Sequence, residues 1–198
     1  MTCKSTENEP SDPCQSESKD LEFRNFDRIV HEYRQNHEQY LNRLLDYYSS
    51  MPSYEKIAEV VGHAKLPSGK RHPHQRRLKS EVLQEVHNAL LDAESRMESC
   101  SSFEELLDTV RETIGDIWGV GELMVYDSAS RLGAYFGLEP EAVYLHRGTR
   151  EGAEAIGIDP DRKKVEVSEL PEPLQNLQPH ELEDCLCIYK DEFRRVAE

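Results

Sequence analysis

The chain has 198 residues, 32% of them charged, and its formal net charge is −15 at pH 7. This length predicts one domain, large enough to fold without a metal or disulfide staple. The charge opposes nonspecific attraction to nucleic acid and anionic lipid, so any such contact requires a local basic patch. No apolar run reaches the roughly 18 residues of a transmembrane helix and no apolar signal core opens the chain, so we expect a cytoplasmic protein without membrane contact.

The first part of the chain divides into a tail and a long helix. Residues 1–20 are rich in Ser, Glu, Asp and Pro, which predicts a disordered acidic tail, and residues 21–198 are expected to form a single helical domain. Apolar residues recur at three- and four-residue steps from Phe26 to Leu45, the pattern of an amphipathic helix. The helix should end before Pro52, because the residue ahead of a proline is pushed out of helical geometry.

After a short helix at about residues 54–61, residues 65–79 read KLPSGKRHPHQRRLK, with six Lys or Arg, two His and no acid. We expect this basic loop to contact nucleic-acid phosphate or to remain solvated. The candidate phosphate contacts are Lys70, Arg71, Arg76 and Arg77, and the candidate ligand-binding residues are His72 and His74. No metal site is predicted, because two histidines alone make a poor one and basic neighbours disfavour a dication.

The remaining periodicity predicts mostly helix. Apolar residues at helical spacing cover residues 78–97 and again residues 182–193, and Pro140 suits the first turn of a further short helix. Residues 163–167, KKVEV, form the one plausible strand, which is too isolated to make a sheet. The predicted fold class is therefore all-α, a multi-helix globular domain with at most one short strand.

Two glycines predict a sharp turn between helices at Gly119-Val120-Gly121. Ser102 and Glu105 form a capping-box pattern where the first of these helices should begin. The resulting helix-hairpin-helix element spans about residues 102–137. Its second helix begins with unpaired backbone N–H groups, which favour an anion such as a nucleic-acid phosphate. The alternative is a tight turn that binds nothing.

The hairpin, followed by Val143-Tyr144-Leu145-His146 and the segment from Gly152 to Gly157, resembles the second half of a helix-hairpin-helix DNA glycosylase, the HhH-GPD fold. The similarity covers about residues 114–157. In that family a hydrophobic-Gly-hydrophobic-Gly turn grips a DNA phosphate. The resemblance therefore implies a helical fold in which Gly119, Val120 and Gly121 hold a phosphate.

The catalytic residues of that family are missing. Leu123 stands where bifunctional members carry a lysine nucleophile, and Tyr144 stands where the family carries its aspartate. The interval between Gly121 and Tyr144 is slightly longer than usual, and no four-cysteine cluster motif follows the hairpin. Leucine cannot form a Schiff base, and tyrosine does not replace a carboxylate that stabilises a sugar cation. We therefore expect a degenerate version of the fold without normal glycosylase catalysis.

Polar residues around the hairpin leave other chemistry open. Asp127 and Arg131, four residues apart, form either a surface ion pair or a pair that orients Arg131 or Tyr126 towards a ligand. His146 and Arg150 belong to a polar cluster that either binds phosphate or carboxylate or closes a helix pair. The candidate catalytic residues are Tyr126, Asp127 and His146.

The five cysteines match neither a disulfide framework nor a zinc pattern, which predicts reduced and passive thiols. Cys185 and Cys187 lie two apart on a predicted helix and are poorly placed to form a disulfide with each other. Glu183 and Asp184 of the same helix are expected on a solvated acidic face.

Three functions remain open from the sequence. The first is weak, salt-dependent contact with DNA through the Gly119–Gly121 turn and the basic loop. The second is an acidic scaffold with a purely structural hairpin and a basic protein as its partner. The third is an enzyme of unassigned chemistry, with one pocket that holds His72, His74, Tyr126, Asp127 and His146. No metal or other cofactor is predicted for any of them.

Overall fold

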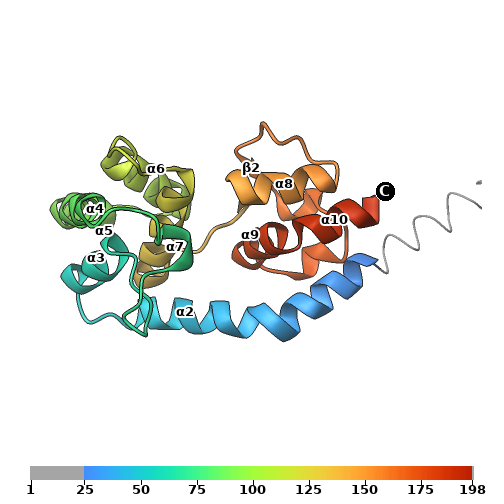
Figure 1. Cartoon of the computed structure of the whole chain (residues 1–198), viewed down its shortest axis with the longest axis horizontal. Helices are drawn as coiled ribbons and strands as arrows, with labels where there is room; N and C mark the ends of the chain where they lie inside the picture. Colours follow the sequence, from blue (N-terminus) through green and yellow to red (C-terminus); the bar gives the residue numbers. More distant parts are fainter. Residues whose placement is uncertain (1–24, 198) are drawn as a thin grey trace, which may run out of the picture.

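The computed structural model describes residues 25–197, and helices dominate it, which confirms the all-α prediction. The tail predicted at residues 1–20 lies outside the described residues. A long helix runs along one side of the molecule, from residue 25 through the π-helical segment η1 (Arg34–Glu38) to the end of α2 (Gln39–Ser49), as Figure 1 shows. It ends before Pro52, as the sequence predicts.

Shorter helices follow the long one. They are α3 (Tyr54–Gly62), η2 (Pro73–Gln75), α4 (Ser80–Asp92), α5 (Glu94–Glu98), α6 (Phe103–Ile114), α7 (Glu122–Phe136), α8 (Arg147–Ala155), η3 (Val167–Glu169), η4 (Leu174–Asn176), α9 (Pro179–Ile188) and α10 (Lys190–Ala197). The sequence predicts α4 and α5 as one helix, and α9 and α10 as another. The chain breaks at Ala93 and at Tyr189 instead, and the apolar spacing does not reveal these breaks because it continues through both. None of the helices within residues 25–197 is both long and apolar enough to cross a bilayer.

The first hydrophobic core packs the C-terminal half of the long helix against α3 to α7. Side-chain caps start two of these helices: Ser53 accepts a hydrogen bond from the N–H of Lys56, and Ser102 accepts one from the N–H of Glu105. The predicted capping box is only half formed. The Glu105 carboxylate accepts hydrogen bonds from the N–H and hydroxyl of Ser101 instead of returning to Ser102.

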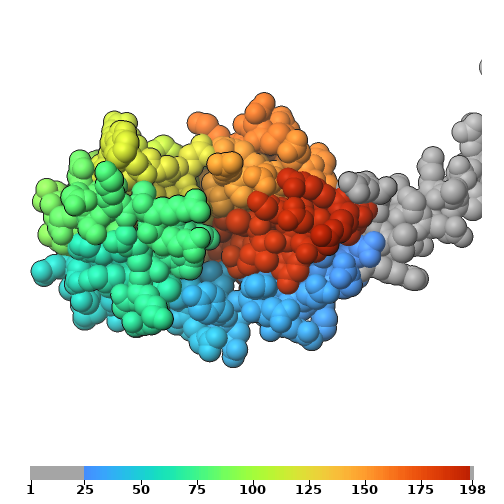
Figure 2. Space-filling model, in the orientation of Figure 1, coloured from blue at the N-terminus to red at the C-terminus, as the bar shows by residue number. Residues whose placement is uncertain are grey.

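The second core packs residues 25–33 of the long helix against α8, α9 and α10. Glycines let α8 and α9 approach closely: a Cβ on Gly152 would lie 2.1 Å from the carbonyl oxygen of Leu186, and one on Gly148 would lie 2.6 Å from Sγ of Cys187. The sequence predicts one domain, whereas the buried apolar side chains gather in two cores that share the long helix. Figure 2 shows the two lobes in contact above that helix.

A small antiparallel sheet belongs to the second lobe. In it β1 (Val143–Tyr144) pairs with β2 (Lys164–Val165). The sequence locates the second strand but misses its partner, because two residues carry no detectable period. The helix predicted to begin at Pro140 is absent: Gly137 ends α7 with a left-handed φ of 71°, the chain then extends into β1, and the next helix starts only after His146.

Candidate functional site

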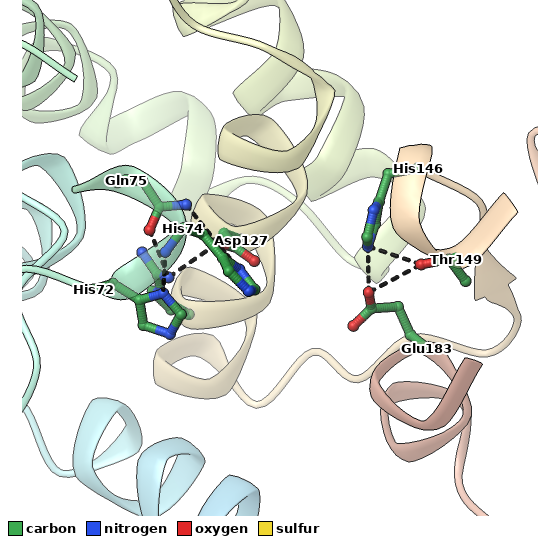
Figure 3. A network of polar contacts seen from close by, with 8 residues as sticks. His72, His74, Gln75, Asp127, His146, Thr149 and Glu183 are labelled. Carbon is green, nitrogen blue, oxygen red and sulfur yellow. Dashed lines mark hydrogen bonds and ion pairs between the residues drawn. The ribbon is translucent and has the colours of Figure 1, made fainter. Parts of the chain in front are cut away.

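Helix α7 lies at the junction of the two lobes, and polar side chains gather on both sides of it. Figure 3 shows two groups. The loop cluster joins α7 to the basic loop and consists of His72, His74, Gln75, Asp127 and Arg131. The α8–α9 cluster joins the start of α8 to α9 and consists of His146, Thr149 and Glu183.

Oδ2 of Asp127 is the centre of the loop cluster. It accepts hydrogen bonds from Nε2 of Gln75 at 2.5 Å and from Nη2 of Arg131 at 3.1 Å. Nδ1 of His74 lies 3.4 Å from the same oxygen, and Nδ1 of His72 accepts a hydrogen bond from the backbone N–H of His74 at 3.4 Å. The sequence does not single out Gln75, since a glutamine in a polar loop has no pattern that marks it as buried.

Asp127 and Arg131 pair as their spacing predicts, but they do not form a surface ion pair. The side chains are only 15% and 7% exposed. A buried ion pair needs further hydrogen bonds to offset the loss of water. Gln75 supplies them: its Nε2 donates to Asp127, and its Oε1 accepts from Nη2 of Arg131 at 3.4 Å. Nη1 of Arg131 is buried and has no partner among the described residues.

The electrostatics of this cluster favour an ionised Asp127 and a neutral His72. Burial opposes the ionisation of Asp127, but Arg131 and His74 outweigh it and hold the pKa of this carboxyl below its usual range. Burial, together with Arg131, lowers the pKa of His72 to about 4. The pKa of His74 is raised, chiefly by its contact with Asp127. At neutral pH the cluster therefore offers a carboxylate and at least one uncharged imidazole.

Three residues of this cluster combine donor atoms that metal ions accept. Within residues 25–197, His72, His74 and Asp127 are the one group of three potential metal ligands, with ligand atoms all within 4.8 Å of one another. The sequence includes all three in the candidate pocket of the enzyme hypothesis, but its assessment of a metal site counted the two histidines alone, because Asp127 lies on a different helix far along the chain.

The α8–α9 cluster centres on Nε2 of His146. This nitrogen contacts Oε1 of Glu183 and, at 2.8 Å, Oγ1 of Thr149, whose hydroxyl also donates to Glu183 at 3.1 Å. A nucleophilic triad needs the hydroxyl and the carboxylate on opposite ring nitrogens, and here they share one. Thr149 is also fully buried, so the cluster fastens α8 to α9 and is not a nucleophilic triad. The predicted solvated acidic face at Glu183 is therefore wrong.

The five candidate residues of the enzyme hypothesis fall into two groups, and Tyr126 lies beside His146. Its buried ring lies 5.5 Å from that of His146 and 6.2 Å from that of Tyr144, measured between centroids. Burial raises the pKa of Tyr126 well above its usual value, so its hydroxyl stays protonated. The adjacent Asp127 joins the loop cluster instead. The candidates thus form two groups, and no hydrogen bond between described residues joins them.

Gly119 and Gly121 have different parts in the turn before α7. Gly119 has a φ of 96°, in the left-handed region, and packs against Val82 of α4 with a Cβ position 3.8 Å from that side chain. Gly121 is the N-cap of α7 at a φ of −119°, with open space around it and no side-chain cap for the helix. Trp118, beside the turn, is 81% exposed, a feature that the sequence alone does not reveal.

The basic loop is folded, and not all of its cations are free. Lys65 and Arg71 pair in an antiparallel bridge, with Gly69 in the left-handed region between them. Arg71 donates to the carbonyl of Leu78 at 2.7 Å and so ties the middle of the loop to its C-terminal end. The exposed predicted contacts without an ion pair among the described residues are Lys70, Arg76 and Arg77.

Arg150, a candidate ligand-binding residue, is engaged with the protein itself. It donates from both terminal nitrogens to the carboxylate of Glu122, at 2.7 and 3.2 Å. Because Glu122 opens α7 and Arg150 lies on α8, this bidentate pair links the two lobes.

The thiols in the described residues are free, and the two on α9 are not activated. Cys100, Cys185 and Cys187 form no disulfide, and Cys3 and Cys14 lie outside the described residues. Burial raises the pKa of Cys187 to about 11 and that of Cys185 further, which suppresses the reactive thiolate.

Together, the fold and the site define a two-lobed helical protein, with polar clusters at the lobe junction and an exposed glycine turn near a basic loop. No family model, no curated protein and no solved structure matches this chain. The likeness to helix-hairpin-helix glycosylases therefore rests on the residues of this chain alone.

Proposed function

We propose that this protein contacts nucleic-acid phosphates at the start of α7, through the Gly119–Gly121 turn and the basic loop, without normal glycosylase catalysis. The observation that carries the proposal is the nearness of these two elements. Gly119 packs against Val82 in the first turn of α4, and α4 begins where the basic loop ends. One region therefore offers backbone N–H donors together with exposed cations.

The start of α7 has the features of an anion-binding helix end. The helix is 15 residues long, and no side chain caps its first N–H groups. These groups and the helix dipole favour a negatively charged ligand. Glu122, the acid of the first turn, is paired with Arg150 and so opposes a phosphate less strongly than a free carboxylate would.

The loop cations stand out because basic side chains elsewhere are often neutralised by acids. Pairs of this kind are Arg162 with Glu169, Lys164 with Glu104 and Lys190 with Glu151. Lys70, Arg76 and Arg77 are exposed without such a partner among the described residues. In a chain of net charge −15 they supply local attraction for a polyanion.

Trp118 extends the proposed surface. An aromatic side chain with most of its area in water is a platform on which an unpaired base can stack, a contact worth about 1–3 kcal/mol per base. The position of Tyr144 bears on catalysis. Its ring packs 5.4 Å from that of Phe103, so it acts as an apolar packing residue where the resemblance would require a carboxylate.

Fluorescence anisotropy with labelled double- and single-stranded oligonucleotides, over a range of salt concentrations, tests the proposal. The double substitution Arg76→Ala/Arg77→Ala should weaken binding and reduce the salt slope by up to about two. Arg43→Ala/Lys163→Ala is the matched control, because it removes the same charge from exposed positions outside the loop. Trp118→Ala should weaken single-strand binding more than duplex binding.

Two outcomes would contradict the proposal. If both double variants lose affinity equally, only net charge matters and the loop is not the contact surface. If the full chain binds neither oligonucleotide at low salt, nucleic-acid contact fails. The acidic scaffold then becomes the better hypothesis, with Trp118 as the residue to test against a basic protein partner.

A further inference from the structure

We infer that His72, His74 and Asp127 form a binding site for a divalent first-row transition ion, such as Zn²⁺ or Fe²⁺. Their potential ligand atoms lie within 4.8 Å of one another, where η2 meets α7. Two imidazole nitrogens and one carboxylate oxygen form the donor set of three-ligand sites that leave coordination positions open to water or substrate. The sequence-based expectation of no metal counted the two histidines without the carboxylate.

The spacing of the donor atoms fits a shared ion. Ligand atoms about 2.1 Å from one ion lie roughly 3–3.5 Å from each other. Nδ1 of His74 and Oδ2 of Asp127 are already 3.4 Å apart, which is long for a hydrogen bond but normal for two ligands of one ion. Nδ1 of His72 accepts only a long hydrogen bond, at 3.4 Å, from the backbone N–H of His74. An ion would replace that contact, either by binding Nδ1 itself or by binding Nε2 in the other tautomer, with the ring proton on Nδ1. The exposed His74 side chain can rotate to close the remaining distance.

The cluster also has bonding capacity that the protein does not use. Oδ1 of Asp127 accepts no hydrogen bond from the described residues, although Oδ2 has three contacts. Nη1 of Arg131 is buried without a partner in the same part of the chain. A bound ion would use the carboxylate, and a water or anion on that ion would be a partner for the guanidinium.

Arg131 is the main charge that opposes a cation here, 3.1 Å from Oδ2 of Asp127. Acids on α9 counter it across the lobe junction, where Glu183 and Asp184 both interact electrostatically with His74. Of the three ligands His74 is the exposed one, so an ion from solution would reach the site past its side chain.

The chain contains its own control for the histidine pair. His63 and His87 have ring centroids 4.8 Å apart, the same separation as His72 and His74. The ring nitrogens of this second pair contact Gln84 and the backbone carbonyl of Glu59, and no carboxylate completes a group of three ligands in the described chain. If paired histidines sufficed, both pairs would bind an ion, whereas our inference assigns the ion to the pair beside Asp127.

The experiment uses the full chain without a polyhistidine tag, stripped of metal and titrated with Zn²⁺ against a chromophoric chelator. Visible absorbance of added Co²⁺ reports the coordination geometry. We expect one ion per chain. His74→Gln should lower the affinity at least about 100-fold, because a direct ligand contributes more to metal affinity than a residue that hydrogen-bonds to a ligand. The control variant His63→Gln/His87→Gln should bind as the parent does.

Because Asp127→Asn also unpairs the buried Arg131, a loss of fold would confuse its result. His74→Gln avoids this, since its side chain is exposed, and a thermal melt verifies each variant. The inference is overturned if the parent binds no ion at micromolar Zn²⁺, or if only the His63→Gln/His87→Gln variant loses it. Arg76→Ala/Arg77→Ala should keep full metal affinity, so this site and the proposed nucleic-acid contact can fail independently.

Discussion

Asp184 has an environment that differs sharply from water. Its Oδ2 accepts a hydrogen bond from the hydroxyl of Tyr33 at 3.3 Å, so the long helix covers a position that the sequence places on a solvated face. Burial, together with Glu183, raises the pKa of Asp184 to about 7. The other charged groups that act on it are His74 and Asp127. In the unfolded chain an aspartate has a pKa of about 4. Between pH 4 and pH 7, roughly, the folded protein therefore holds a proton that the unfolded chain releases, so its stability falls as the pH rises.

Replacing this carboxyl should therefore change how stability depends on pH. Asp184→Asn retains an acceptor for Tyr33 and removes the buried charge. We expect the free energy of unfolding to rise by on the order of 2 kcal/mol at pH 8 and to change little at pH 5, measured by urea denaturation. Asp161→Asn, at an exposed position, should leave the pH dependence as it is. An equal change in the free energy of unfolding at pH 8 and at pH 5 would contradict the assignment.

At the scale of elements, the turn between α6 and α7 separates two glycines that look equivalent in the sequence. The sequence assigns the sharp turn to both glycines alike. The structure points instead to Gly119, whose φ of 96° strains any other residue, whereas Gly121 has a φ of −119° and open surroundings. The turn geometry thus depends on one glycine, and the other leaves the first N–H groups of α7 accessible.

This difference gives a direct comparison of two alanine variants. Gly119→Ala should lower the free energy of unfolding by about 1–2 kcal/mol, because an alanine resists the left-handed conformation. Gly121→Ala should cost less than about 1 kcal/mol, since only a modest N-cap preference is lost. Thermal or urea unfolding of both proteins measures the difference. The reverse order would mean that the turn in solution differs from the one described.

At the scale of the whole molecule, two hydrophobic cores share one long helix. Residues 25–33 belong to the second core, α2 belongs to the first, and the π-helical segment η1 lies between them without a buried residue of its own. The lobes also meet through the Glu122–Arg150 pair and the contact of Tyr126 with His146. Unfolding should therefore be one cooperative transition as long as the helix is continuous.

Breaking the helix between the cores tests which connection couples the lobes. Asn36 is exposed in η1, and its side chain donates to the carbonyl of Glu32 at 2.9 Å. Asn36→Pro should cost about 3 kcal/mol or more and split the calorimetric transition in two. Asn36→Ala should lose only the side-chain bond and keep one transition. One transition in the proline variant as well would show that the junction contacts alone couple the lobes.

The sequence by itself determined the helical class, most of the helices and the turn. Periodicity, prolines and caps act over a few residues, so local chemistry marks the long helix, α3, α6 and α7 without knowledge of their partners. Local signals were weaker where tertiary contacts override them. The breaks at Ala93 and Tyr189 leave the apolar spacing unchanged, and β1 is too short to have a period.

Only the tertiary structure decided the candidate sites. The sequence groups His72, His74 and Asp127 only within a larger candidate pocket, and the fold separates these three from Tyr126 and His146. It also joins His146 to Glu183 of α9 and buries the Asp127–Arg131 pair beneath a glutamine. These contacts join segments that are distant along the chain, and they form only because two apolar cores bring those segments together. Local spacing carries no record of such packing, so no pattern in the sequence could have assembled the sites.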